Sequence, residues 1–208
     1  MPDIKFGPIS HWDTVLNTGP NLLELTWGIA SFPIPNQISG NFVFYVSGAE
    51  GISVHHLLHN GNFLEIAQSL TDTPDSLLTG LDNIEVVRQG GKSWLIGVAH
   101  GDSALNVYEI NAETGLLTFA SAVSEGLALT TTATLAQLRV GNQSFVLTFN
   151  RLNDNLGIWQ VSDSGVPTRV NLVSGAVQPL AGVGVVASLQ LDGPSTNRDG
   201  FSRPVARG

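Results

Sequence analysis

The chain has 208 residues, of which 42% are hydrophobic and only 12% are charged, and its net charge is −8. This apolar content is enough for the core of one all-β domain, a class that often runs to about 200 residues. The negative charge disfavours nucleic acid and anionic membrane surfaces as partners, because both repel an acidic protein. The absence of cysteine excludes disulfides and thiolate metal sites.

The N-terminal part of the chain predicts an irregular group of strands. "DIKFGPI" (3–9) predicts a strand on an outer edge, and "LLELTWGIASF" (22–32) predicts the first strand of a sheet. After an insertion that contains prolines, "NFVFYVSG" (41–48) is a nearly continuous apolar run, typical of a strand buried on both faces. "GISVHHLLHNGNFLEIAQSL" (51–70) alternates, turns at Gly61 and alternates again, which predicts a hairpin.

The next part of the chain repeats this pattern twice. Segments 83–92 and 134–143 each predict a strand that ends in a short glycine turn. The apolar runs "SWLIGVAHG" and "SFVLTFN" then match "NFVFYVSG", and hairpins at 104–123 and 155–173 match the first hairpin at a spacing of about 52 residues. Core and turn positions coincide in the three hairpins: Val54, Val107 and Ile158; His55, Tyr108 and Trp159; Leu57, Ile110 and Val161; Gly61, Gly115 and Gly165.

The repeating unit therefore has four short strands, and no segment has the apolar spacing of a helix. Four-stranded units at a fixed period are typical of β-propeller blades, whereas the alternative, a β-sandwich, gives no reason for such a repeat. The sequence thus predicts a single all-β, β-propeller-like domain over residues 1–208, with about four blades of four-stranded antiparallel sheets. The approximate blades are 22–80, 81–131, 132–181 and an incomplete 182–208, with residues 1–21 as a candidate outer strand.

The end of the sequence leaves the closure of the ring open. "GVGVVASLQLDG" (182–193) predicts the first strand of a fourth blade, but no apolar run follows it. The alternatives are a compact four-bladed ring, an open arc whose edges pair with another chain, and a piece of a longer protein. Exposed sheet edges promote association, so we expect a second copy or another protein chain as partner. Residues 170–191 lack charge but contain proline, glycine and polar residues, which predicts strands rather than a membrane span.

Two segments resemble known families. "LNVYEINAETGLL" (105–117) is similar to the strand–turn–strand of lactonase-type seven-bladed propellers, and "AEGISVHHLLHNGNFLEIAQSLTDT" (49–73) is similar to the propeller repeats ahead of the calcium-binding repeats in secreted RTX-type bacterial proteins. The first resemblance implies hydrolysis of a sugar lactone at a channel mouth, although no catalytic residue carries over to this chain. The second implies a bacterial protein outside the cell, but the calcium-binding nonapeptide itself is missing.

The N-terminus has no basic region followed by an apolar run, so the sequence predicts no cleaved secretory signal. With the RTX-type resemblance, this favours an extracellular or cell-surface protein that is exported without a leader. The cytoplasm is the alternative location.

Acidic residues recur at one position of the repeat, in the connection between its second and third strands. Glu50, Asp102 and Asp154 would lie on one rim, where they could bind a cation or a polar ligand. Turns also favour acidic residues for their own backbone hydrogen bonds. His100 lies next to the Asp102 connection and is a candidate base beside a carboxylate, or a polar strand end.

Other candidates have weaker patterns. His55, His56 and His59 could bind a metal only if the strand is distorted, because neighbouring side chains point to opposite faces. Arg88 and Arg139 coincide just before a glycine turn, which fits a solvated strand end or an anion site. Trp12 and Trp27 have no place in the repeat and are candidates for a sugar- or partner-binding surface.

No catalytic motif occurs in the chain: it has no phosphate loop, dinucleotide fingerprint or metalloprotease motif. We therefore expect a non-catalytic interaction or structural module that acts through protein–protein association, with no catalytic residue and no cofactor. Calcium is the alternative cofactor. The alternative functions are a lactonase-like hydrolase and a carbohydrate-binding propeller.

Overall fold

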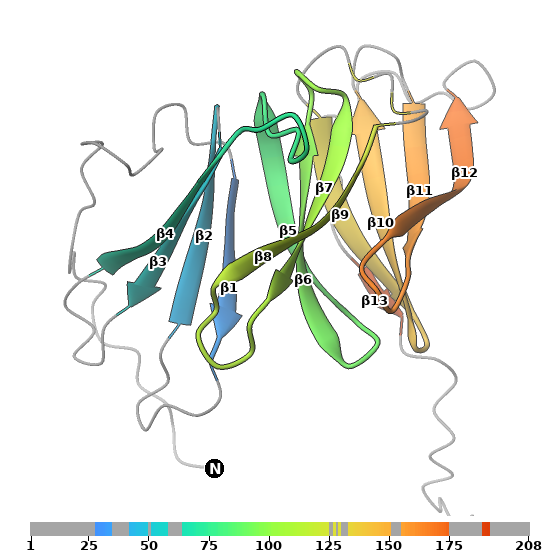
Figure 1. The fold of residues 1–208 in the computed structure, drawn as a ribbon. Coiled ribbons are helices and arrows are strands. Elements are labelled where there is room, and N and C mark those ends of the chain that lie inside the picture. Colours follow the sequence, from blue (N-terminus) through green and yellow to red (C-terminus); the bar gives the residue numbers. More distant parts are fainter. Residues whose placement is uncertain are drawn as a thin grey trace, which may run out of the picture.

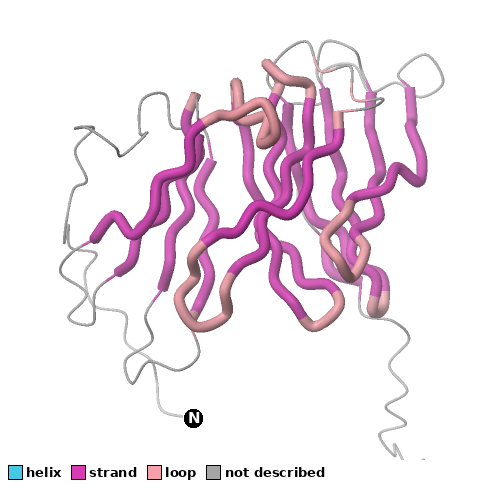
Figure 2. Tube along the Cα trace, viewed as in Figure 1, coloured by secondary structure: helices cyan, strands magenta, loops and turns pink. Residues whose placement is uncertain are grey.

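The computed structural model describes residues 28–34, 42–49, 51–57, 64–124, 127, 129, 133–150, 155–174 and 189–191. Within these residues the chain forms strands and turns and no helix (Figure 2). The strands make three sheets, ordered β1-β2-β3-β4, β5-β6-β7-β8 and β12-β11-β10-β9-β13. Their bounds are β1 Gly28–Pro33, β2 Phe42–Gly48, β3 Gly51–Leu57, β4 Leu64–Thr71, β5 Leu81–Gln89, β6 Lys92–Ala99, β7 Ala104–Ile110, β8 Leu117–Val123, β9 Ala133–Val140, β10 Gln143–Asn150, β11 Asn155–Val161, β12 Pro167–Ser174 and β13 Leu189–Leu191.

The three sheets pack face to face in chain order, with the β5–β8 sheet in the middle (Figure 1). One apolar core lies between the first and middle sheets, around Tyr45, Leu95 and Tyr108. A second core lies between the middle and third sheets, around Trp94 and Trp159. Successive side chains of a strand point to opposite faces, so the middle sheet supplies both cores. This explains why its strand β6 is a nearly continuous apolar run, as the sequence predicted.

The repeat extends to the detail of the backbone. In each sheet the pairing of the third and fourth strands shifts register at the same place, so the fourth strand carries one extra residue, a β-bulge. The shift falls at positions that the sequence alignment brought together; of these, Ile158 was predicted as a core position but belongs to neither core of the described residues. These positions are Val54/His55, Val107/Tyr108 and Ile158/Trp159, and the extra residues are Ala67, Ala120 and Val170.

The glycine turns of the second and third hairpins contact the sheet before them. Gly115 and Gly165 have positive φ angles of 70° and 81°, a conformation that favours glycine. A Cβ on Gly165 would lie 2.6 Å from the ring of Trp94, and one on Gly115 would clash with Val43. Tyr45 of the first sheet also donates a hydrogen bond of 2.9 Å to the Gly115 carbonyl. Each turn therefore needs glycine both for its backbone and for the close approach of the neighbouring sheet.

Strand β13 differs from the prediction. The sequence predicted that 182–193 opens a fourth blade, but the described residues Leu189–Leu191 pair parallel with Leu138–Val140 of β9 and extend the third sheet. This pairing occupies backbone groups along an edge of β9 that would otherwise be open. The all-β, propeller-like fold is confirmed, whereas the blade boundaries and the closure of the ring stay predictions. The segments 1–27 and 192–208 lie outside the described residues.

Membrane insertion by a helix finds no support in the described part of the chain. None of its segments forms a helix of the length and apolar character that crossing a membrane requires.

Candidate functional site

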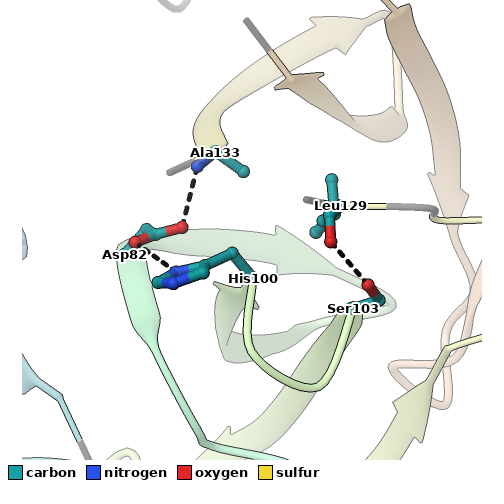
Figure 3. Close-up of polar contacts among 5 residues, drawn as sticks. All are labelled: Asp82, His100, Ser103, Leu129 and Ala133. Carbon is teal, nitrogen blue, oxygen red and sulfur yellow. Dashed lines mark hydrogen bonds and ion pairs between the residues drawn. The ribbon is translucent and has the colours of Figure 1, made fainter. Parts of the chain in front are cut away.

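A histidine and a buried aspartate meet at one end of the middle sheet. Asp82 is the second residue of β5, and His100 directly follows the last residue of β6. His100 Nδ1 lies 2.9 Å from Asp82 Oδ1, and Asp82 Oδ2 accepts a hydrogen bond of 2.7 Å from the backbone N–H of Ala133 (Figure 3). The Asp82 side chain is fully buried, whereas that of His100 is 28% exposed. The Asp82 carboxylate thus orients the His100 imidazole and links β5 to the start of β9.

Burial dominates the electrostatics of this pair. Removal from water raises the pKa of Asp82, while the Ala133 N–H and His100 act in the opposite direction. Both carboxylate oxygens have partners, as a buried carboxylate requires. An oriented, partly exposed imidazole beside a carboxylate is an arrangement that can accept a proton in acid–base catalysis.

The carboxylate next to His100 is not the one that the sequence suggested. Asp102 Oδ2 instead accepts a hydrogen bond of 2.8 Å from the backbone N–H of Thr79. Thr79 in turn donates through its hydroxyl to Asp72, whose other oxygen accepts from the N–H of Leu78 at 2.6 Å. This contact is a backbone hydrogen bond of the kind that the sequence offered as the alternative to a ligand-binding rim, and the rim itself stays a prediction. Glu50 and Asp154, the other two rim candidates, lie outside the described residues.

The connection after His100 is held in an uncommon conformation. Ser103 has a φ of 50°, in the left-handed region that residues other than glycine rarely occupy. Its hydroxyl donates a hydrogen bond of 2.8 Å to the carbonyl of Leu129 (Figure 3). Like the Asp82–Ala133 bond, this contact joins the middle sheet to the chain that leads into the third sheet. The site is thus an anchor between sheets with one partly exposed imidazole.

His55 and His56 have structural partners. His55 is almost completely buried in the position of Tyr108 and Trp159, its Nε2 lies 2.9 Å from the Ser53 hydroxyl, and burial lowers its pKa. His56 Nε2 lies 2.9 Å from the carbonyl of Thr114 in the neighbouring sheet. In the described part of the chain no three His, Asp or Glu side chains gather as a metal site. His59, Trp12 and Trp27 lie outside that part.

A groove lies at the other end of β5, between the middle and third sheets. Its volume is about 750 Å³, and both Arg88 and Arg139 line it. The sequence repeat brought these two arginines to equivalent positions, but the groove also depends on Asp163 of the β11–β12 turn. The sequence could not predict this contribution, because it depends on how two sheets pack against each other.

Neither a family model nor a curated protein sequence matches the chain. Among solved structures, an exo-β-1,3-galactanase variant from Phanerochaete chrysosporium in complex with β-1,3-galactotriose matches with a TM-score of 0.50 at 11% identity, over 73% of this chain and 39% of that chain. A galactanase from Clostridium thermocellum gives a TM-score of 0.49 at 14% identity, over 76% and 37%. A protein from Lactobacillus plantarum gives 0.46 at 17%, over 72% and 45%.

The chain therefore spans less than half the length of these structures. With the three repeated antiparallel sheets, the first match defines the fold as part of a β-propeller of about three to four blades. At this identity the likeness concerns the fold alone. The resemblance to RTX-type repeats stays a prediction.

Proposed function

We propose that the chain is a non-catalytic structural module that acts by packing its third sheet, through the face turned away from the middle sheet, against a second copy of the chain. The observation that carries this proposal is an apolar surface on that sheet. Val146 and Trp159 form a cross-strand pair that faces the core shared with the middle sheet. The residues next to them in each strand must therefore point to the opposite face.

That opposite face, here called the outer face, is apolar and only partly exposed, since Ala136 and Phe149 on it are buried. Leu147 pairs with Ile158 across β10 and β11, and Phe145 pairs with Leu138 across β10 and β9. These side chains, together with Leu156, are half-buried. None of them belongs to the two cores of the described residues. In a propeller such a face is covered by the next blade.

Association through the outer face would bury these apolar side chains, whereas pairing of strands at the sheet edges would not. Contiguous apolar patches on a protein surface mark interaction sites, because their burial is favourable by about 25 cal/mol per Å². We therefore infer that two copies join through their outer faces. In line with the RTX-type resemblance, we place this assembly outside the cell.

Light scattering coupled to gel filtration tests this proposal. The wild-type protein is expected to have a mass that rises from monomer to dimer or larger with concentration, and Leu147→Asp is expected to remain monomeric. Val166→Asp is the control, since Val166 is an exposed apolar residue in the β11–β12 turn. A wild-type protein that is strictly monomeric at high concentration contradicts the proposal. Circular dichroism separates loss of association from loss of folding.

The Asp82–His100 pair favours a second candidate function, a hydrolase that acts on a sugar lactone or on a glycan. The substrate class follows from the lactonase-like motif and from the galactanase among the structural matches. Sugar lactones and β-1,3-linked galactan oligosaccharides are the substrates to assay. Turnover that is lost in His100→Ala and kept in Asp102→Ala would replace the structural role with this one.

A further inference from the structure

The groove between the middle and third sheets lies where three turns converge. The turns of the β5–β6, β9–β10 and β11–β12 hairpins supply Gly90 and Gly91, Asn142, and Asp163. The β5–β6 and β9–β10 turns lie on the same side of the molecule, at the bottom of the view in Figure 1. The volume of about 750 Å³ lies within the range of small-molecule sites, which is about 300–1,000 Å³.

Positive charge is concentrated here in a protein whose net charge is −8. The described part of the chain contains four basic residues, and three of them line this groove: Arg88, Lys92 and Arg139. The single carboxylate in the lining belongs to Asp163, and its Oδ1 already accepts a hydrogen bond of 2.7 Å from Gln89. With three cationic side chains and one carboxylate in its lining, the groove has a net positive charge, whereas the chain as a whole has a net negative charge.

The lysine and the arginines differ in what they offer to a ligand. Lys92 Nζ forms an ion pair of 2.9 Å with Glu109 and lies 5.5 Å from the centre of the Trp94 ring, so its charge is largely used within the sheet. Among the described residues no carboxylate lies within ion-pair distance of Arg88 or Arg139. Arg139 has one weak hydrogen bond, from Nε to the carbonyl of Gly141 at 3.3 Å.

The repeat explains why two arginines lie at the same end of the molecule, where both line the groove. Each lies near the end of the first strand of its sheet, shortly before a turn with positive-φ glycine. Because β5 and β9 occupy equivalent places in adjacent sheets, equivalent residues lie at the same end of the molecule.

We propose that this groove binds a small polyvalent oxyanion, with Arg88 and Arg139 as its main charged contacts. The planar guanidinium group suits carboxylate and phosphate oxygens because it can donate two parallel hydrogen bonds. Ser93, Asn142 and Gln143 in the lining add polar groups that can bind further oxygens. The groove uses none of the apolar residues named for the outer face and does not depend on the proposed association.

Isothermal titration calorimetry at low ionic strength tests this inference, with citrate and pyrophosphate as probes for the two oxyanion chemistries. We expect at least one of them to bind with one equivalent per chain, and Arg88→Gln and Arg139→Gln each to weaken binding at least tenfold. Binding of citrate alone identifies a carboxylate site, and binding of pyrophosphate alone identifies a phosphate site. Both arginines are at least partly exposed, so these variants are expected to fold.

Arg169→Gln is the matched control, because Arg169 lies on β12 outside the groove lining. It is expected to bind the probe as the wild type does. The inference is overturned if neither probe binds at millimolar concentration, or if binding persists in both groove variants. An equal loss in Arg169→Gln would also overturn it, because that result indicates attraction to the overall charge and not to a site.

Discussion

Replacing Gly165 by alanine tests how the turns join neighbouring sheets. Two costs add in this variant. The backbone there has a φ of 81°, and a left-handed conformation costs a residue with a side chain roughly 1–2 kcal/mol. The new Cβ would also lie 2.6 Å from the Trp94 ring, which is only 2% exposed and cannot easily move. Overpacking of a filled core costs about 1–3 kcal/mol, so the total is about 2–5 kcal/mol.

Gly91→Ala separates the two costs. Gly91 has a similar φ of 76°, but no atom lies within 4 Å of the position of a Cβ. This variant is expected to lose only the backbone contribution of roughly 1–2 kcal/mol. Equilibrium unfolding in urea, followed by circular dichroism, measures both free energies. If Gly165→Ala costs no more than Gly91→Ala, the turn does not pack on the neighbouring sheet as described.

Two further variants test buried polar contacts. Burial raises the pKa of Asp82 in the folded protein, so the protonated form of Asp82 favours the folded state. This contribution to stability is complete below the ordinary carboxyl pKa and is lost as the pH rises through the raised pKa. The unfolding free energy of the wild type should therefore fall relative to that of Asp82→Asn as the pH rises from about 4, and parallel pH profiles would contradict this. Gln68 bonds to both the N–H and the carbonyl of Leu117 in the next sheet, at 2.8 and 3.0 Å, so urea unfolding of Gln68→Ala should show a loss of about 1–3 kcal/mol. The exposed Gln160→Ala should cost less than about 0.5 kcal/mol, and equal losses would argue against the contact between sheets.

Patterns within one repeat were readable from the sequence. The alternation of the hairpins, the apolar run of β6 and the turn glycines each depend on residues that are neighbours along the chain. Comparison of the copies also located the positions Tyr108 and Trp159, which occupy equivalent places in their sheets. These features give the fold class because they are local and recur.

Contacts between distant segments were not readable in the same way. The sequence placed His100 beside Asp102, its neighbour along the chain, whereas antiparallel pairing of β5 with β6 brings Asp82 next to it. The bulges were missed as well, because an extra residue in one strand is visible only against its partner. The groove at Arg88 and Arg139 needs the packing of two sheets, which no single strand encodes.

The bulges in the outer strands affect how copies of this protein can meet. Strands β4, β8 and β12 each form an edge of their sheet, and an edge strand can recruit a strand from another molecule into an endless ribbon. The extra residues Ala67, Ala120 and Val170 interrupt the regular spacing of backbone groups that such recruitment requires. Growth by strand addition is therefore hindered at the β4, β8 and β12 edges, which favours an assembly of finite size through the broad side of a sheet.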